Sequence, residues 1–146
     1  MKKFELTTEF ITNFLGTKLF RIKALVEFGK VEKGELGGFV EKEENLDHDG
    51  DAWVSGDARV SGDARVSGDQ MYATVKGFGS EYRNTTFFIT KDGNVCVNCG
   101  CFSGTLEQFR EKVEETHKDT KYAKEYLMIA DLMEMHFKEE LEKIKK

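Results

Sequence analysis

The segment from Gly77 to Thr85 reads GFGSEYRNT and combines residue types that recognise a small anionic ligand. Two glycines let a backbone approach a ligand closely, and the Arg83 guanidinium can hold a phosphate through two parallel hydrogen bonds. Aromatic rings stack on bases, while amides and hydroxyls supply hydrogen bonds. Such groups stand at Phe78, Ser80, Tyr82, Asn84, Thr85 and Phe88. The segment therefore predicts a nucleotide-type pocket, and an ordinary hairpin loop with a structural arginine is the alternative.

A second arginine, Arg110, falls on a predicted helix. It joins Arg83 if that helix packs over the strands, and otherwise it is a solvated helix position. The segment is not a Walker loop, because it lacks Gly-Lys-Ser/Thr and no helix follows it. The predicted pocket would therefore hold phosphate through arginine side chains.

Cys96, Cys99 and Cys101 lie close together and, with His117, raise the question of a zinc site. Structural zinc takes four ligands in paired knuckles, whereas this spacing is irregular. Cys96 alternates with two valines, which predicts a core position. The other two cysteines precede a predicted helix, where a thiolate is stabilised, but no base is adjacent in sequence. We expect packed side chains, with no metal, no cofactor and no catalytic nucleophile.

A repeat precedes the segment from Gly77 to Thr85 in the sequence. Gly50 to Asp69 reads GDAWVSGDARVSGDARVSGD, with a period of six residues. A helix with a glycine at this spacing would lose about 1 kcal/mol per glycine relative to alanine. Each Gly-Asp pair predicts a turn, and each Ala-x-Val unit predicts a short strand with Trp53, Arg59 or Arg65 pointing outward. The pattern predicts a short hexapeptide β-solenoid with valine inside.

The hexad Val-Ser-Gly-Asp-Ala-Arg resembles the left-handed β-helix family over roughly Leu46 to Asp69. That resemblance implies about three hexads per coil and hence about one to two coils, whose open ends need caps. Long members of the family are acyltransferases that use a histidine, but so few coils cannot form an acyl-donor groove. We expect His48 to be structural. The preceding run, LFRIKAL through GDAWV, resembles the lead-in of phage and prophage hexapeptide-repeat proteins, which implies a capping role.

After the repeat, three strands are predicted over residues 72–78, 85–90 and 95–98, with a hairpin turn at Asp92-Gly93. Thr105 and Gln108 have the spacing of a capping box at the start of a helix that ends near His117. The predicted fold class is mainly β plus α: a short hexapeptide β-solenoid, then an antiparallel β-meander and two C-terminal helices. The predicted domains are 1–70 and 71–146.

The second predicted helix, from about residue 120 to 145, carries one continuous apolar stripe about 38 Å long. Its members are Ala123, Tyr126, Leu127, Ala130, Met133, Phe137, Leu141 and Ile144. A module with three short strands cannot cover such a stripe. We therefore expect a homo-oligomer, a dimer or a trimer of dimers, with Met133 and Phe137 in its contact.

Composition limits the class of partner. The chain has 146 residues and a net charge of −5, which argues against a duplex nucleic-acid partner because phosphate contact needs a basic face. The first twenty residues contain no long apolar run, so we expect no signal peptide, no membrane partner and a cytoplasmic location.

The second half, GFGSEYRNT through AKEY, is similar to the phage Thoeris anti-defence sponges, which sequester a cyclic ADP-ribose isomer or cyclic oligonucleotides between subunits. The resemblance implies a non-catalytic sponge for a cyclic nucleotide signal in the cytoplasm of the host cell. By residue type, arginines would contact phosphate, asparagines the base or ribose, and aromatic rings would stack. The assigned residues are Phe78, Tyr82, Arg83, Asn84, Phe88, Asn98 and Arg110. The alternative is a structural or protein-interaction module without a small-molecule ligand.

Overall fold

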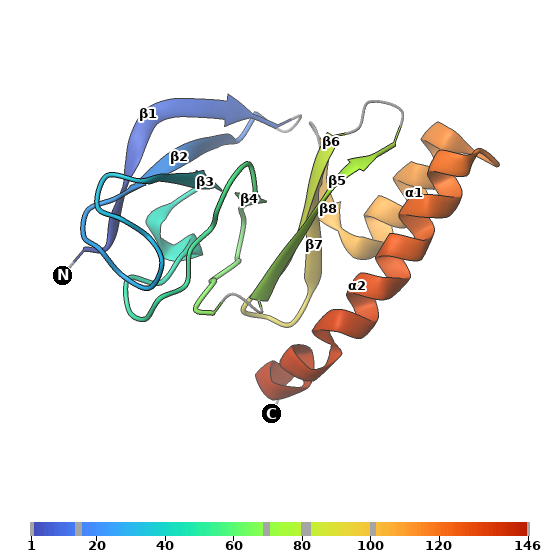
Figure 1. The fold of residues 1–146 in the computed structure, drawn as a ribbon. Coiled ribbons are helices and arrows are strands. Elements are labelled where there is room, and N and C mark those ends of the chain that lie inside the picture. The colour runs from blue at the N-terminus through green and yellow to red at the C-terminus, as the bar shows by residue number, and fades with distance from the viewer. Residues whose placement is uncertain (1, 14–15, 69–70, 80–82, 100–101, 146) are drawn as a thin grey trace.

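The computed structural model describes residues 2–13, 16–68, 71–79, 83–99 and 102–145. Within these ranges the chain forms two four-stranded sheets and two C-terminal helices, a β plus α fold (Figure 1). The first sheet contains β1 (Phe4–Thr12), β2 (Lys18–Ala24), β3 (Leu36–Val40) and β4 (Arg59–Val60). The second contains β5 (Tyr72–Phe78), β6 (Arg83–Ile89), β7 (Val95–Cys99) and β8 (Phe102–Thr105). The helices are α1 (Leu106–His117) and α2 (Lys121–Lys145).

The predicted hexapeptide solenoid is wrong, because the N-terminal half forms a mixed sheet of order β1-β2-β3-β4. Strands β1, β2 and β3 pair antiparallel, and only β3 and β4 pair in parallel, through Phe39–Arg59 and Val40–Val60. The repeat is too short to stack on itself, and β2 occupies the other side of β3. Within the described repeat only Arg59–Val60 is a strand, and an isolated bridge joins Leu46 to Val66.

The repeat nevertheless fixes which side chains enter the core. Its three valines are fully buried, and its three alanines are at most 4% exposed. Gly56 and Gly62 have φ values of 60° and 63°, the left-handed region that a turn requires and that glycine adopts without a Cβ clash. The prediction that valine points inward is confirmed, and the core of the first sheet is built on Val54, Val60 and Val66.

Trp53 was expected to point outward, and this is wrong: its side chain is only 6% exposed. The indole packs edge-on against the Phe28 ring, with 5.4 Å between centroids. Gly37 makes room for it, because a Cβ on Gly37 would lie 2.6 Å from Cζ2 of Trp53. The hexad pattern hid this contact, since the space for the indole comes from a glycine in a different strand.

The second sheet is antiparallel throughout, in the order β5-β6-β7-β8. The turn between β6 and β7 is closed by the Thr90 amide, which donates to the Asn94 carbonyl at 2.9 Å. Strand β8 was not predicted, because Ser103 and Gly104 have low strand propensity. It forms by pairing with β7, and it leads directly into α1.

The capping box at the start of α1 is confirmed. The Gln108 amide donates to Thr105 Oγ1 at 3.2 Å, and the Thr105 amide donates to Gln108 Oε1 at 2.9 Å. Both helices cover the face of the second sheet that is turned away from the first sheet (Figure 1). Phe87 of the sheet, Phe109 of α1 and Tyr126 of α2 meet in this second core.

The apolar stripe of α2 is covered within the chain. Met133 is 5% exposed and Phe137 is fully buried, so both lie in the core of their own chain. The homo-oligomer itself stays a prediction. The stripe exceeds three short strands, but α1 packs along α2 and adds to the surface that β5 and β6 provide. The boundary predicted at residue 70 lies outside the described residues, and independent folding of residues 1–70 and 71–146 stays a prediction.

Candidate functional site

The predicted ligand residues lie on opposite faces of the second sheet. Side chains alternate along a strand, so Phe88 joins the core of the first sheet while its neighbour Phe87 joins the core with the helices. Tyr82 is outside the described residues. The residues of the predicted pocket are therefore not brought together. Some lie at the junction of the two sheets, and others lie on the face that the helices cover.

Asn98 lies at the junction of the two sheets, where it is 2% exposed. Its Nδ2 donates to the Arg59 carbonyl at 2.8 Å and to Ser61 Oγ at 3.1 Å. On the adjacent strand, Thr86 Oγ1 accepts the Arg59 amide at 2.8 Å and lies 3.3 Å from Asn84 Oδ1. Asn98 and, through Thr86, Asn84 thus contact the junction that fastens β4 to β6 and β7.

Two further contacts strengthen this junction. The Tyr72 hydroxyl donates to the Trp53 carbonyl at 2.6 Å. The Lys91 amide donates to the Asp63 carbonyl at 3.1 Å. Phe88 is buried in the same region, with 2% exposure. Asn98, which was predicted from its type to bind a ligand, is here one of the residues that hold the two sheets together.

On the other face, Phe78 and Arg83 are register partners at the end of β5 and β6. Phe78 is half-buried and Arg83 is exposed. The Tyr126 hydroxyl donates to the Phe78 carbonyl at 3.0 Å, and burial raises the pKa of this phenol to about 12. A Cβ on Gly79 would overlap the Tyr126 ring. Close packing of a helix, rather than approach of a ligand, accounts for that glycine.

Arg110 is held by three carboxylates of the two helices. It contacts Glu107 of α1, and it lies 2.9 Å from Asp131 and 3.0 Å from Glu134 of α2. The expectation that α1 packs over the strands is met, because α1 and β7 are in contact. The guanidinium is nonetheless committed to an ion-pair network between α1 and α2, and the network competes with any phosphate.

The two described cysteines also face opposite sides of the second sheet. Cys96 packs against the core of the first sheet, and Cys99 packs against the core with the helices. Burial raises the pKa of the Cys96 thiol to about 11, so this thiol is protonated at neutral pH. Thr85 Oγ1 donates to Cys99 Sγ at 3.2 Å. This placement prevents the two sulfurs from sharing one metal ion; Cys101 is outside the described residues.

His48 has a structural environment. Its ring stacks on Phe4, with centroids 4.4 Å apart, and its Nδ1 accepts the Lys3 amide at 3.0 Å. The buried Lys3 side chain in turn donates to the Ala52 carbonyl at 2.6 Å. These contacts close the first sheet over the loop before the repeat.

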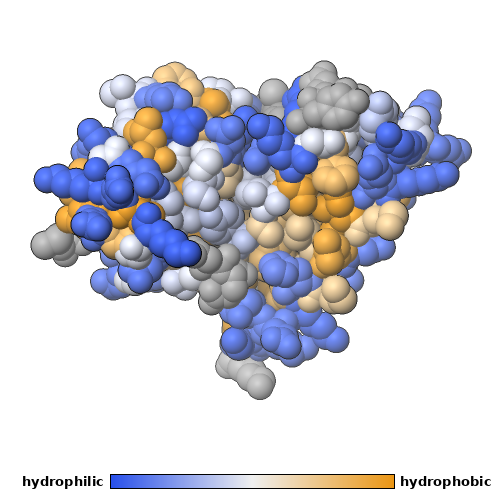
Figure 2. Space-filling model, viewed as in Figure 1, coloured by the Kyte–Doolittle hydropathy of each residue, from blue (hydrophilic) through white to orange (hydrophobic). Residues whose placement is uncertain are grey.

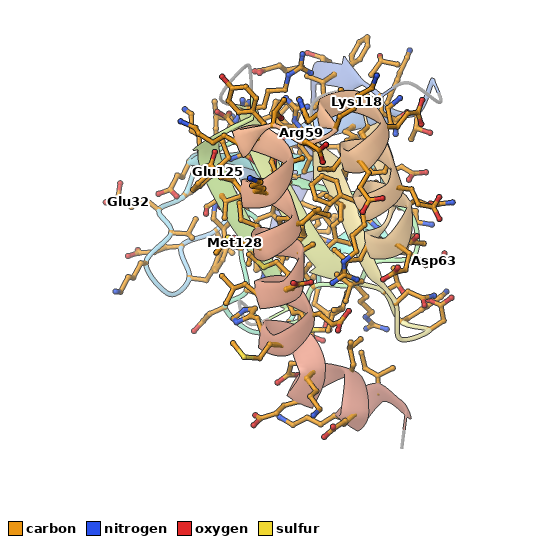
Figure 3. All side chains as sticks on the ribbon, turned by 90° about the vertical axis from the view of Figure 1, so that its right-hand side faces the viewer. Glu32, Arg59, Asp63, Lys118, Glu125 and Met128 are labelled. Carbon is orange, nitrogen blue, oxygen red and sulfur yellow. The ribbon has the colours of Figure 1, made fainter. Side chains whose placement is uncertain are left out.

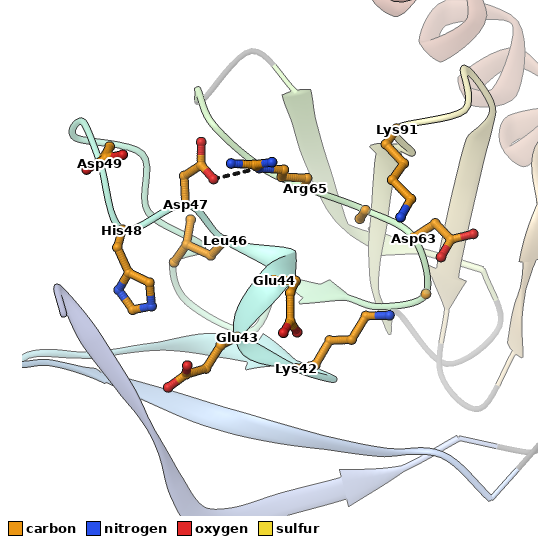
Figure 4. Close-up of a pocket in the computed structure, with 12 residues that line it drawn as sticks. Lys42, Glu43, Glu44, Leu46, Asp47, His48, Asp49, Asp63, Arg65 and Lys91 are labelled. Atoms are coloured by element: carbon orange, nitrogen blue, oxygen red, sulfur yellow. Dashed lines mark hydrogen bonds and ion pairs between the residues drawn. The ribbon is translucent and has the colours of Figure 1, made fainter. Parts of the chain in front are cut away.

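An open cavity of about 510 Å³ lies beside His48, between the segment after β3 and the turn at Asp63 (Figure 4). Its basic side chains are Lys42, Arg65 and Lys91, and its acidic ones are Glu43, Glu44, Asp47, Asp49 and Asp63. Arg65 is paired with Asp47 at 2.8 Å. Since carboxylates outnumber cations, the electrostatics of this cavity disfavour a phosphate.

The side of α2 that faces away from the sheet carries three exposed apolar residues. Met128 is 71%, Leu132 is 50% and Met135 is 68% exposed. Figure 3 labels Met128 on α2. Apolar residues gather over the second sheet and α2 on the face of the molecule shown in Figure 2. The sequence pattern could have revealed these three, since they recur at spacings of four and three on the face opposite the buried stripe. The predicted stripe contains only residues of the buried face.

Among the described residues, neither helix has both the length and the apolarity needed to cross a bilayer. Within the same residues, no three His, Cys, Asp or Glu side chains are grouped so as to hold a metal ion. No protein-family model, curated protein or solved structure matches the chain.

Proposed function

We propose that this chain is a non-catalytic protein-interaction module, whose binding surface is the exposed side of α2. The observation that carries the proposal is the row of Met128, Leu132 and Met135 on that side. A long helix with one apolar face in the core and a second apolar row in water is a common form of helix-mediated recognition. Burial of such side chains stabilises a complex by about 25 cal/mol per Å² of apolar surface.

The polar groups of the second sheet support a binding role over chemistry. The Cys96 thiol, with its pKa of about 11, is not a nucleophile at neutral pH. Asn98 and Arg110 are engaged in contacts between strands and between helices. The Arg110 contacts fix α2 against α1, and a helix that is held in place loses little entropy when it binds.

A photoreactive amino acid at position 132 tests this proposal. After irradiation of cells that express the chain, we expect the photoreactive residue at position 132 to form covalent adducts of higher mass. We expect Met128→Lys to suppress these adducts. The matched control is the same photoreactive residue at position 36, because Leu36 is also about half exposed, at 54%, but lies on β3 of the first sheet and not on α2. Absence of adducts from position 132, or equal adducts from position 36, would refute the assignment of this surface.

A second candidate function is the sequestration of a cyclic nucleotide signal in the cytoplasm. One observation favours it: the exposed Arg83 and the half-buried Phe78 are register partners, which places a cation beside an aromatic ring at one end of the second sheet. The test is a thermal-shift screen with cyclic ADP-ribose isomers and cyclic oligonucleotides. A ligand at about 100 times its dissociation constant adds about 2.7 kcal/mol of stability. A shift that Arg83→Ala removes supports this function, and a flat screen eliminates it.

A further inference from the structure

The exposed side of α2 has an ordered charge pattern as well as an apolar row. Its central residues, Met128, Leu132 and Met135, recur at spacings of four and three, and charged residues at similar spacings flank them on the same side of the helix. We call them the outer face: Lys121, Lys124, Glu125, Met128, Leu132, Met135, Lys138, Glu139 and Glu142. Lysines predominate at its N-terminal end, methionine and leucine occupy the middle, and glutamates predominate at its C-terminal end. When two such helices lie antiparallel, the lysine-rich end of one therefore lies beside the glutamate-rich end of the other.

We propose that the outer face binds the outer face of a second copy of this chain, with the two α2 helices antiparallel. This inference rests on the proposed function and names the partner. A two-fold axis between Asp131 and Leu132 sets Met128 of each copy opposite Met135 of the other. The two Leu132 side chains then lie beside the axis, so that six apolar side chains form the centre of the contact.

The same axis sets opposite charges against each other at both ends of the contact. Lys124 lies opposite Glu139, and Lys121 lies opposite Glu142. Because the arrangement is symmetric, each pair occurs twice.

Glu125 and Lys138 lie on opposite flanks of the helix, so this register does not pair them. None of these six charged residues has an ion pair within the described part of the chain. A parallel arrangement would instead set each residue against its own copy and hence like charges against each other, which is unfavourable. The charge order therefore selects the antiparallel pair.

The surroundings of the outer face leave room for a second helix. Helix α1 is bonded to α2 through Arg110, on one flank at Asp131 and Glu134. Next to that flank an open groove of about 520 Å³ is lined by Asp131, Glu134, Met135, Lys138, Leu141 and Glu142. The outer face spans about 32 Å from Lys121 to Glu142 at 1.5 Å per residue. A helix pair of this length is a small interface, so we expect an exchanging dimer rather than an obligate one.

Sedimentation velocity on the whole chain, over about 5–200 µM, tests the contact. We expect a monomer–dimer equilibrium. Leu132→Glu places two new carboxylates at the axis beside both Asp131 residues, and it should raise the dissociation constant by at least about a hundredfold. The matched control is Leu36→Glu, since Leu36 and Leu132 are 54% and 50% exposed. Circular dichroism should show unchanged helix content in both variants.

Charge exchange tests the register. Lys124→Glu creates two repulsive pairs with Glu139 and should weaken the dimer about tenfold, and the double variant Lys124→Glu/Glu139→Lys should restore it. A parallel dimer would not respond in this way. A chain that stays monomeric, or a double variant that does not recover, overturns the inference. If position 132 then still yields adducts with a different protein, the interaction module survives without self-association; if it yields none, both proposals fail.

Discussion

Asn98→Ala is the substitution that most directly tests the account of the second sheet. If Asn98 contacts a ligand, its loss leaves the fold intact. If it fastens the second sheet to the first, its loss weakens the fold itself. The residue is 2% exposed, and its Nδ2 donates to the Arg59 carbonyl and to Ser61 Oγ across the junction.

The expected loss follows from these contacts. Two hydrogen bonds contribute about 1 kcal/mol each, and the buried acceptors left behind add about 1–3 kcal/mol. One opposing term reduces this sum, because Asn98 Oδ1 is buried with no hydrogen-bond partner among the described residues, and its removal relieves that cost. The net expected decrease in the free energy of unfolding is about 2–3 kcal/mol. For a chain of this size this lowers Tm by roughly 8–12 °C.

Two probes make the assay sensitive to the junction. Trp53 is the single tryptophan and lies in the core of the first sheet, so its fluorescence reports on that half. Far-ultraviolet circular dichroism reports chiefly on the helices that cover the second sheet. We expect the two urea transitions to coincide in the parent chain. In Asn98→Ala both should move to lower urea, with the fluorescence transition first.

The matched control is Asn84→Ala. Asn84 is on the same face of the second sheet, but it is half-buried, and among the described residues its side chain accepts one bond, from Thr86 Oγ1 at 3.3 Å. Its loss should cost less than about 1 kcal/mol. The reasoning is refuted if Asn98→Ala melts within about 2 °C of the parent chain, or if Asn84→Ala is equally damaging.

Gly37, Lys3 and Cys96 each occupy a buried place where a substitution or a pH change has a measurable effect. Gly37→Ala should lower the urea midpoint sharply and expose Trp53 to quenchers, because the added Cβ would lie 2.6 Å from the indole; an unchanged midpoint contradicts this packing. Lys3→Met should cost about 1–3 kcal/mol, measured by thermal melting, since the buried carbonyl of Ala52 loses its donor. Burial favours the neutral Cys96 thiol, so in a Cys99→Ser/Cys101→Ser background Cys96 should react with iodoacetamide only as pH approaches about 11. For the same reason the free energy of unfolding should fall as pH rises from 9.0 through about 11. Half-maximal reactivity near pH 9 would disprove this.

Local sequence signals predicted the helices and the hairpin well. The Thr105 and Gln108 capping box and the Asp-Gly turn are decided by neighbouring residues, and both are present where the pattern places them. The inward valines of the repeat were equally readable. The repeat does not indicate which other segment of the chain pairs with β3. The choice between stacked coils and a mixed sheet depends on which segment lies beside β3, and β2 takes that place through long-range pairing.

The candidate site was less predictable for the same reason. Residue types such as Asn98 and Arg110 suit a ligand as well as a structural contact, and the deciding factor is what lies across from them. Asn98 meets the backbone of Arg59, which is 39 positions away in the chain, and Arg110 meets α2. The exposed row at Met128 and Leu132 carried a signal in the helix period, but the longer buried stripe on the opposite side masked it.

The junction also has a consequence for folding during synthesis. The first sheet leaves the ribosome before the second. Strand β3 cannot pair with β4 until Val60 has been synthesised. Thr86 and Asn98, whose side chains bind β4 to the second sheet, are synthesised later still. The second sheet and α1 join neighbours in the chain, and local contacts of this kind form quickly. During synthesis the first sheet is therefore exposed to chaperones and to wrong pairing until the residues of the second sheet follow it.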